Sequence, residues 1–143
     1  MTKTFYEIFS EVEKAKTKKE KIETLRKYSS GALKMVLGAT YDPRVKWLLP
    51  EGAPPYKPLA KGSDGELDLS GELRKLYLFV EGDTETQKNL KQTKRETLFI
   101  GLLESLDPDE AKVLIGMKDR KLPFKGITRK LIAEAFPNLA KDW

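Results

Sequence analysis

Apolar residues recur at helical spacing along most of the chain, and the strict alternation that is typical of strands is missing. In the first such segment, Phe5, Ile8 and Val12 fall on one face of a helix. The pattern predicts helices over residues 2–15, 18–28, 30–40, 70–82, 95–106, 108–117 and 129–136, with a more polar helical segment at 84–94. We therefore expect an all-α protein, a compact multi-helix domain of about six or seven helices.

Capping residues mark several helix boundaries. Thr17 and Glu20 have the spacing of a capping box, in which a hydroxyl and a carboxylate satisfy free N–H groups at a helix start. Asp107 is a good N-cap, and the Pro108 that follows it suits the first helical position. Thr128 is the expected cap of the last helix. These signals place the starts of three helices.

Other helix starts are left open by the sequence. The segment Thr93-Lys94-Arg95-Glu96 has the form of a capping box, which starts the Leu98 helix there, and one long bent helix from residue 84 is the alternative. Apolar positions also predict that Met35 and Tyr77 lie in the core.

A proline- and glycine-rich connection covers residues 50–69. A structureless connection of this length is uncommon within a compact domain. Its closely spaced prolines indicate an extended segment, packed by Tyr56 and Leu59, and not a freely flexible one. We expect a single helical domain over the whole chain, with the alternative of two lobes, 1–49 and 70–143, that this connection joins.

Composition limits the chemistry that the chain can perform. Of its 143 residues, 39% are hydrophobic and 34% are charged, and no apolar run is longer than a few residues. We expect a cytoplasmic protein without a membrane span or a secretory signal. The absence of Cys and His excludes disulfides, thiol nucleophiles, histidine bases and zinc sites built from these residues. No cofactor is expected.

Positive charge is concentrated at the two ends of the chain. Residues 1–60 carry twelve Lys or Arg against seven acids, residues 61–90 carry four against seven, and residues 91–143 carry eleven against eight. The formal net charge is +5. This distribution predicts a basic face and an acidic back, and it favours an anionic partner.

The densest positive charge lies between Lys118 and Lys130, where six Lys or Arg stand against one Asp. Arg129 and Lys130 fall in the first turn of the last helix, where cations oppose the macrodipole, so local helix energetics do not explain them. Gly126 permits close backbone approach, and a helix start offers free N–H groups. Together these features predict a phosphate site, with a merely solvated surface loop as the alternative.

The stretch LLESLDPDEAKVLIGMKDRKLPFKGITRKLIAEAFP resembles the end of the N-terminal DNA-binding domain of ATP-dependent DNA ligases. In that family a leucine helix precedes a Pro-Glu-Ala helix, and a basic strip ending in Gly-(Ile/Val)-(Ser/Thr) leads into another helix. The similarity extends to the opening pair of helices and to Tyr41-Asp42-Pro43-Arg44, and it is greatest for the ligases of T4-like bacteriophages. The whole chain is also similar to small proteins encoded by such phages, which implies an infected bacterial cell as its location.

The resemblance implies a non-catalytic, sequence-independent protein that grips the backbone of duplex DNA. The predicted contacts are Arg44, Lys118, Arg120, Lys121, Lys125, Gly126, Thr128, Arg129 and Lys130. Arg44 has the alternative of pairing with Asp42. The loop Arg120-Lys121-Leu122-Pro123-Phe124-Lys125 differs from the short Asp-Leu-Arg-Ile-type strip of the ligases, so the resemblance does not fix its side-chain orientations.

A second hypothesis is a protein-interaction module that reuses this scaffold to bind a host or phage protein, such as an acidic DNA mimic. Phe124 would then be an exposed aromatic anchor within a basic interface.

An enzyme is not expected. The stretch Lys61-Gly62-Ser63-Asp64-Gly65 is one residue too long for the Lys-x-Asp-Gly adenylation motif of ligases, and no nucleotidyltransferase domain follows it. We interpret it as a turn. Asp107, Asp109 and Glu110 form a tight acidic cluster that a helix cap explains better than a metal site does.

Overall fold

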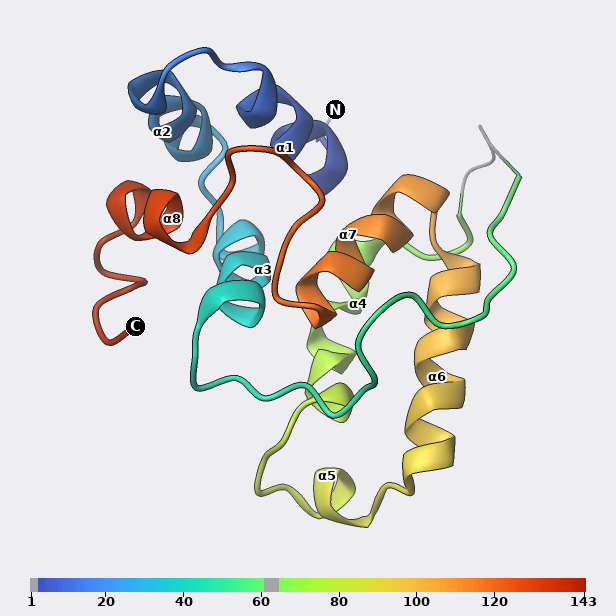
Figure 1. Cartoon of the computed structure of the whole chain (residues 1–143). Helices are drawn as coiled ribbons and strands as arrows, with labels where there is room; N and C mark the ends of the chain where they lie inside the picture. Colours follow the sequence, from blue (N-terminus) through green and yellow to red (C-terminus); the bar gives the residue numbers. More distant parts are fainter. Residues whose placement is uncertain (1–2, 61–64) are drawn as a thin grey trace.

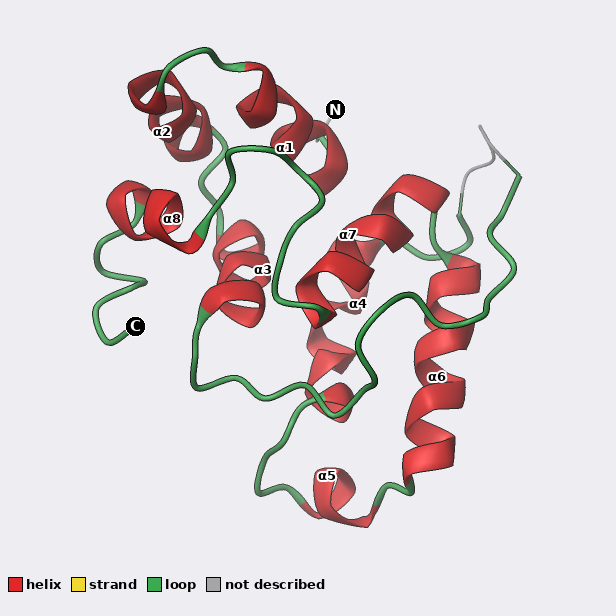
Figure 2. Cartoon of the chain, in the orientation of Figure 1, coloured by secondary structure: helices red, strands yellow, loops and turns green. Residues whose placement is uncertain are grey.

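The computed structural model describes residues 3–60 and 65–143, and within these ranges the regular elements are helices (Figure 2). In chain order they are α1 (Phe5–Lys14), α2 (Lys18–Lys27), α3 (Gly31–Tyr41), α4 (Leu69–Glu72), the 3₁₀-helix η1 (Leu73–Phe79), α5 (Glu85–Asn89), α6 (Gln92–Ser105), α7 (Pro108–Lys118) and α8 (Arg129–Ala135) (Figure 1). The prediction of an all-α domain is confirmed. The stretch Lys61 to Asp64, which we interpreted as part of a turn, lies outside the described residues.

The predicted caps at Thr17, Asp107 and Thr128 form. The Thr17 hydroxyl accepts from the Glu20 N–H at 3.1 Å, and the Asp107 carboxylate accepts from the Asp109 N–H at 2.8 Å. The capping box at Thr17 is only half formed, because the Glu20 carboxylate accepts from the Lys16 N–H instead, at 3.4 Å. Local capping chemistry therefore sets three helix starts where the sequence places them.

The helix predicted over residues 70–82 is instead the short α4 followed by η1. Leu73, Leu76 and Phe79 are spaced by three and are all buried. This spacing aligns side chains on one face of a 3₁₀-helix, which has three residues per turn. Tyr77 consequently points outward with an exposed fraction of 43%, and Met35 on α3 is 52% exposed. The prediction that these two residues lie in the core is wrong.

Residues 84–105 form two helices with a break at Leu90 and Lys91. The capping box predicted at Thr93 does not form, since α6 already begins at Gln92. The buried Arg95 guanidinium fixes this geometry by donating to the Leu78 carbonyl at 3.0 Å and to the Gln92 side chain at 2.7 Å. A tertiary contact therefore overrides the local capping signal.

Helices from the two ends of the chain share one core. α1 and α3 pack against α7, and α2 packs against α8, so segments far apart in sequence lie side by side (Figure 1). Buried apolar side chains from residues 1–49 and from residues 70–143 belong to the same cluster. The two lobes considered from the sequence thus contribute to a common core.

The proline-rich connection is packed along the helices. The Lys57 N–H donates to the Glu104 carboxylate on α6 at 2.8 Å. Just before the connection, the Leu48 N–H donates to the Phe79 carbonyl at 2.8 Å. Tyr56 is partly buried against the core. The prediction of a packed segment is confirmed for Tyr56.

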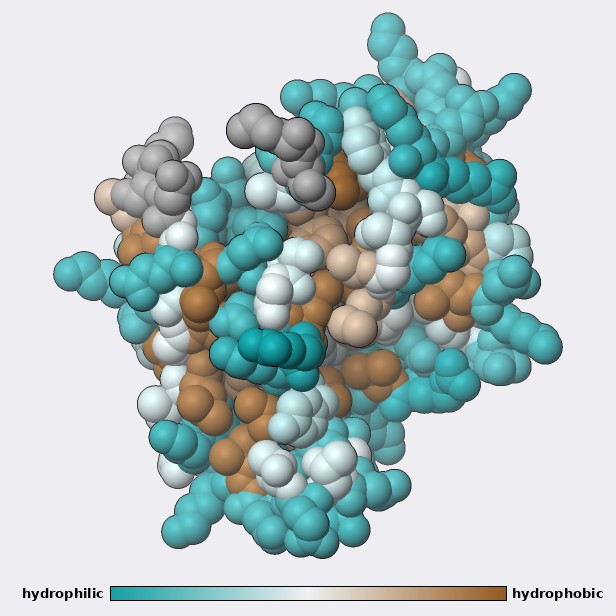
Figure 3. Space-filling model, turned by 180° about the vertical axis from the view of Figure 1, so that it is seen from behind, coloured by the Kyte–Doolittle hydropathy of each residue, from teal (hydrophilic) through white to brown (hydrophobic). Residues whose placement is uncertain are grey.

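In Figure 1, α7 lies between α6 and the loop that precedes α8. From behind, apolar side chains gather over the side where α6 lies, and hydrophilic side chains cover much of the rim (Figure 3). None of the helices in residues 3–60 and 65–143 combines the length and apolar character needed to cross a bilayer.

Candidate nucleic-acid interface

The segment from Asp119 to Thr128, here called the basic loop, joins α7 to α8 and is fixed by buried apolar side chains. Leu122, Phe124 and Ile127 are each at most 7% exposed. The Phe124 ring packs edge to face on Tyr6, with 5.2 Å between ring centroids. Phe124 is therefore a core residue, and the prediction that it is an exposed aromatic anchor is wrong. The burial of Phe124 could not be predicted from the sequence, because a single aromatic residue flanked by Pro and Lys has no helical periodicity.

The backbone of the basic loop is held against α1. The Lys125 N–H donates to the Glu13 carboxylate at 2.5 Å. Gly126 has a φ of +83°, and a Cβ at this position would lie 3.2 Å from Lys21 Cε. The turn thus requires glycine for both its left-handed conformation and its close approach to α2.

Lys118, a predicted contact, is buried. Its ammonium donates to the Pro50 and Gly52 carbonyls, both at 2.8 Å, and pairs with the Asp119 carboxylate. Asp119 also accepts from the Gly52 N–H at 3.0 Å. Lys118 therefore clamps the proline-rich connection onto the end of α7, and its charge is not available to a ligand.

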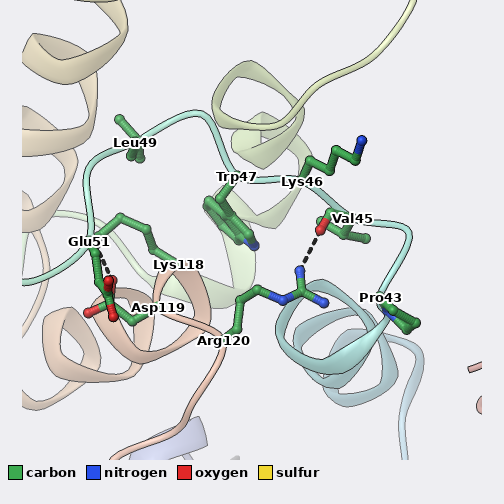
Figure 4. A pocket seen from close by; sticks show the side chains of 9 residues that line it. All are labelled: Pro43, Val45, Lys46, Trp47, Leu49, Glu51, Lys118, Asp119 and Arg120. Carbon is green, nitrogen blue, oxygen red and sulfur yellow. Dashed lines mark hydrogen bonds and ion pairs between the residues drawn. The ribbon is translucent and has the colours of Figure 1, made fainter.

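Arg120 is also held internally. Its guanidinium donates to the Val45 carbonyl (Figure 4) and to the Asp42 carbonyl. Its backbone adopts a left-handed φ of +62°, which is uncommon for a non-glycine residue. This geometry turns the side chain toward the end of α3. Arg120 therefore has a structural role, and a DNA contact at this residue stays a prediction.

Arg44 forms the alternative pair that the sequence left open. Its guanidinium donates to both carboxylate oxygens of Asp42, at 3.0 and 2.9 Å, and lies 3.9 Å from Asp142. Hydrogen bonding from Arg44 is the main reason that the pKa of Asp42 is lowered. Much of the Arg44 charge is therefore compensated within the protein.

The remaining predicted residues are exposed. Thr128 caps α8 by accepting from the Leu131 N–H at 3.2 Å, while Arg129 and Lys130 begin that helix. The side chains of Lys121, Lys125, Arg129 and Lys130 make no hydrogen bond or ion pair with any described residue. Four uncompensated cations thus lie on or directly after the basic loop.

Three surface hollows adjoin the basic loop. The first, of about 480 Å³, lies between the segment Pro43–Glu51 and the end of α7 (Figure 4). The middle one, of about 390 Å³, lies between the end of α3 and the start of α8. The third, of about 280 Å³, lies between α2 and α8. Arg120 lines the first two and Thr128 lines the last two, so the hollows are neighbours along one surface, here called the basic track.

The track includes cations from the N-terminal half that the sequence did not single out. Lys46 is exposed beside the first hollow. Lys18 and Lys21 line the third, but Lys18 pairs with Glu134 at 2.5 Å. The Lys21 ammonium donates to carbonyls at the end of α1, the shortest contact being 2.7 Å to Ala15. Only the fold shows that Lys18 and Lys21 of α2 lie beside α8. In the sequence alone, they cannot be told apart from the other lysines of α2.

Among the residues that the structure describes, no group of three or more potential metal-ligating side chains occurs. In the tight acidic cluster at the start of α7, Asp107 and Glu110 have different structural roles. Asp107 caps the helix, and the Glu110 carboxylate points to α1, where it accepts from the Tyr6 N–H.

A family model described as a family of unknown function, DUF6433, matches residues 8–123, and the chain belongs to this family. The matched span runs from α1 into the basic loop. Neither the curated proteins nor the solved structures contain a match to this chain.

Proposed function

We propose that this protein is a non-catalytic, sequence-independent DNA-binding protein that grips the duplex backbone through the basic track. The observation that carries the proposal is a set of four exposed, uncompensated cations on one fixed loop and the helix start that follows it. Lys121 and Arg129 line the middle hollow and Lys130 lines the third, while Lys125 lies on the basic loop between them in sequence. Lys46 adds a fifth exposed cation at the far end of the track.

The chemistry of the track suits phosphate and not base edges. Lys and Arg side chains on a backbone held by Phe124 and Gly126 present charge at fixed positions, which is sufficient for sugar and phosphate contacts. No helix of the basic track presents a row of Asn, Gln or Arg suited to base edges in a groove. Binding is therefore expected to be independent of sequence, with a dissociation constant of about 1 μM or weaker at physiological salt.

Arg129 and Lys130 give a further argument from helix energetics. Both lie in the first turn of α8, where a cation is unfavourable with respect to the helix dipole. A bound phosphate would compensate this positive charge. No contact within the described part of the chain explains these two cations, whereas an anionic ligand would.

The resemblance to the DNA-binding domain of ligases supports the same proposal. The chain's lack of a Lys-x-Asp-Gly sequence supports a binding role without catalysis. We place this role in the cytoplasm, in an infected bacterial cell if the chain is phage-encoded as its resemblance implies.

The alternative is that the same track binds an acidic surface of a host or phage protein. Charge complementarity favours this partner as it favours DNA. The alternative is weakened by the burial of Phe124, since the basic loop then lacks the exposed aromatic anchor that dominates many protein interfaces.

A charge-reversal pair tests the proposal. The track variant replaces Lys121, Lys125 and Arg129 with Glu, and the control variant replaces Lys88, Lys91 and Lys94 with Glu. The control residues are exposed and lie at α5 and the start of α6, away from the basic loop (Figure 1). Both variants change the net charge equally, so loss of duplex binding in the folded track variant alone supports the site. Equal loss in both would show only a general charge effect.

A further inference from the structure

The middle hollow of the basic track has an apolar floor and a cationic rim. Its almost fully buried lining residues are Tyr41, Ile127 and Thr40, of which the first two supply the apolar floor. Arg120, Lys121 and Arg129 line the rim. A flat, charged surface is sufficient to contact phosphates, so this apolar concavity is not explained by backbone binding alone.

The walls of this hollow are preorganised. The Tyr41 hydroxyl donates to the Ile127 carbonyl at 3.3 Å, which joins the end of α3 to the basic loop. The Arg120 guanidinium is fixed on the Asp42 and Val45 carbonyls. A ligand would therefore meet a formed site and would not have to order these walls.

The middle hollow also holds more uncompensated charge than its neighbours. Lys121 and Arg129 both line it, and neither pairs with a described residue. In the third hollow, by contrast, Lys18 pairs with Glu134 and Lys21 is bound by carbonyls. In the first hollow, Lys118 is buried with Asp119. Only Lys46 and Lys130 remain uncompensated in these two outer hollows.

We propose that the middle hollow takes one unpaired nucleotide of the bound DNA, with the base over Tyr41 and Ile127 and the adjoining phosphate between Lys121 and Arg129. This inference rests on the proposed function and names the form of DNA that the track prefers. The hollow's volume of about 390 Å³ lies within the range of about 300–1,000 Å³ for small-molecule sites. A paired base would first have to be unstacked and unpaired, at a cost of a few kcal/mol, so an unpaired base enters more easily.

Fluorescence anisotropy with three labelled duplexes of equal length tests the inference. The first duplex is fully paired, the second carries one extra thymidine as a bulge, and the third carries an abasic unit at the bulge. The bulged duplex should bind about tenfold tighter than the paired one, within the effect of one stacked base. The abasic bulge has a similar bend without a base and should lose most of this gain.

A pair of substitutions at Lys121 separates charge from space. Lys121→Gln removes one cation and should weaken binding to both the paired and the bulged duplex, while a preference for the bulge remains because the hollow stays open. Lys121→Trp also removes the cation, but its ring can occupy the hollow, so the preference for the bulge should disappear. Far-ultraviolet circular dichroism checks that both variants remain folded.

The outcomes distinguish this inference from the proposed function. Equal affinity for paired and bulged duplexes overturns the nucleotide site and leaves DNA binding by the track intact. No binding to any duplex overturns both. Thymidine monophosphate at millimolar concentration should remove the preference for the bulge while binding to the paired duplex persists. Saturable binding of this mononucleotide without any preference for the bulge would instead assign the hollow to a free nucleotide and overturn its assignment to DNA.

Discussion

The carboxylate of Glu110, in the first turn of α7, accepts a hydrogen bond from the backbone N–H of Tyr6, in the first turn of α1, at 3.1 Å. Glu110 is only 4% exposed. Burial raises the pKa of Glu110 to about 7, the backbone donors Tyr6 and Phe5 oppose this rise, and the nearby carboxylates of Asp68 and Asp107 add to it. Tyr6 in turn packs on Phe124 of the basic loop, so Glu110 supports the surface that carries the track.

This raised pKa predicts that the stability of the protein depends on pH. The ordinary pKa of the group is 4.5, and in the folded protein it is about 7, so the folded state binds the proton more tightly. The resulting stabilisation is complete below pH 4.5 and is lost as the pH rises through 7, by up to about 3 kcal/mol.

Glu110→Gln isolates this effect, since the amide oxygen still accepts from Tyr6 and carries no charge. Urea unfolding should show the variant gaining stability relative to the wild type as the pH is raised from 5 to 8. A difference in unfolding free energy that is constant over this range would show that Glu110 does not titrate as described.

Lys118→Met should destabilise the protein by about 2–3 kcal/mol, because it leaves the Pro50 and Gly52 carbonyls without their donor and the Asp119 carboxylate without its ion-pair partner. The matched control is Lys112→Met on the same helix. The Lys112 side chain is exposed and 3.7 Å from Asp109, so its loss should change stability by about 0.5 kcal/mol or less.

Chemical denaturation of both Lys118 and Lys112 variants measures these changes. The DNA affinity of the folded Lys118 variant should match that of the wild type, because its ammonium is not on the surface. If this variant lost DNA binding while its stability stayed unchanged, Lys118 would be a DNA contact after all.

Gly126→Ala should cost about 1–2 kcal/mol, because the left-handed φ and the nearby Lys21 side chain both disfavour a Cβ. Gly31→Ala is the control. A Cβ at Gly31 meets no atom within 4 Å, and alanine is the better helix former at the start of α3. Thermal unfolding should show a lowered midpoint for the first variant alone, and equal midpoints would remove the special role of Gly126.

The parts of the fold that local chemistry determines could be predicted from the sequence. Thr17, Asp107 and Thr128 cap helices where expected, since a cap needs only its own backbone neighbours. The 3₁₀-helix η1 and the break before α6 could not, because they depend on the burial of Phe79 and on the distant partners of Arg95.

The candidate site was also only partly predictable from the sequence. Charge density alone identified the basic loop, and Lys121, Lys125, Arg129 and Lys130 are exposed there. Lys118 could not be separated from them, because its partners Pro50 and Gly52 are more than sixty residues away in sequence and meet it only in the folded chain.

The most direct test of DNA binding by the basic track is the salt dependence of duplex affinity, measured by anisotropy with the wild type and both charge-reversal variants. With four uncompensated cations on or directly after the basic loop and Lys46 beside the first hollow, the logarithm of the association constant should fall against the logarithm of salt concentration with a slope of about −3 to −5. The control variant should keep this behaviour and the track variant should lose binding. A slope near zero, absent binding at low salt, or unchanged binding by the folded track variant would contradict the account.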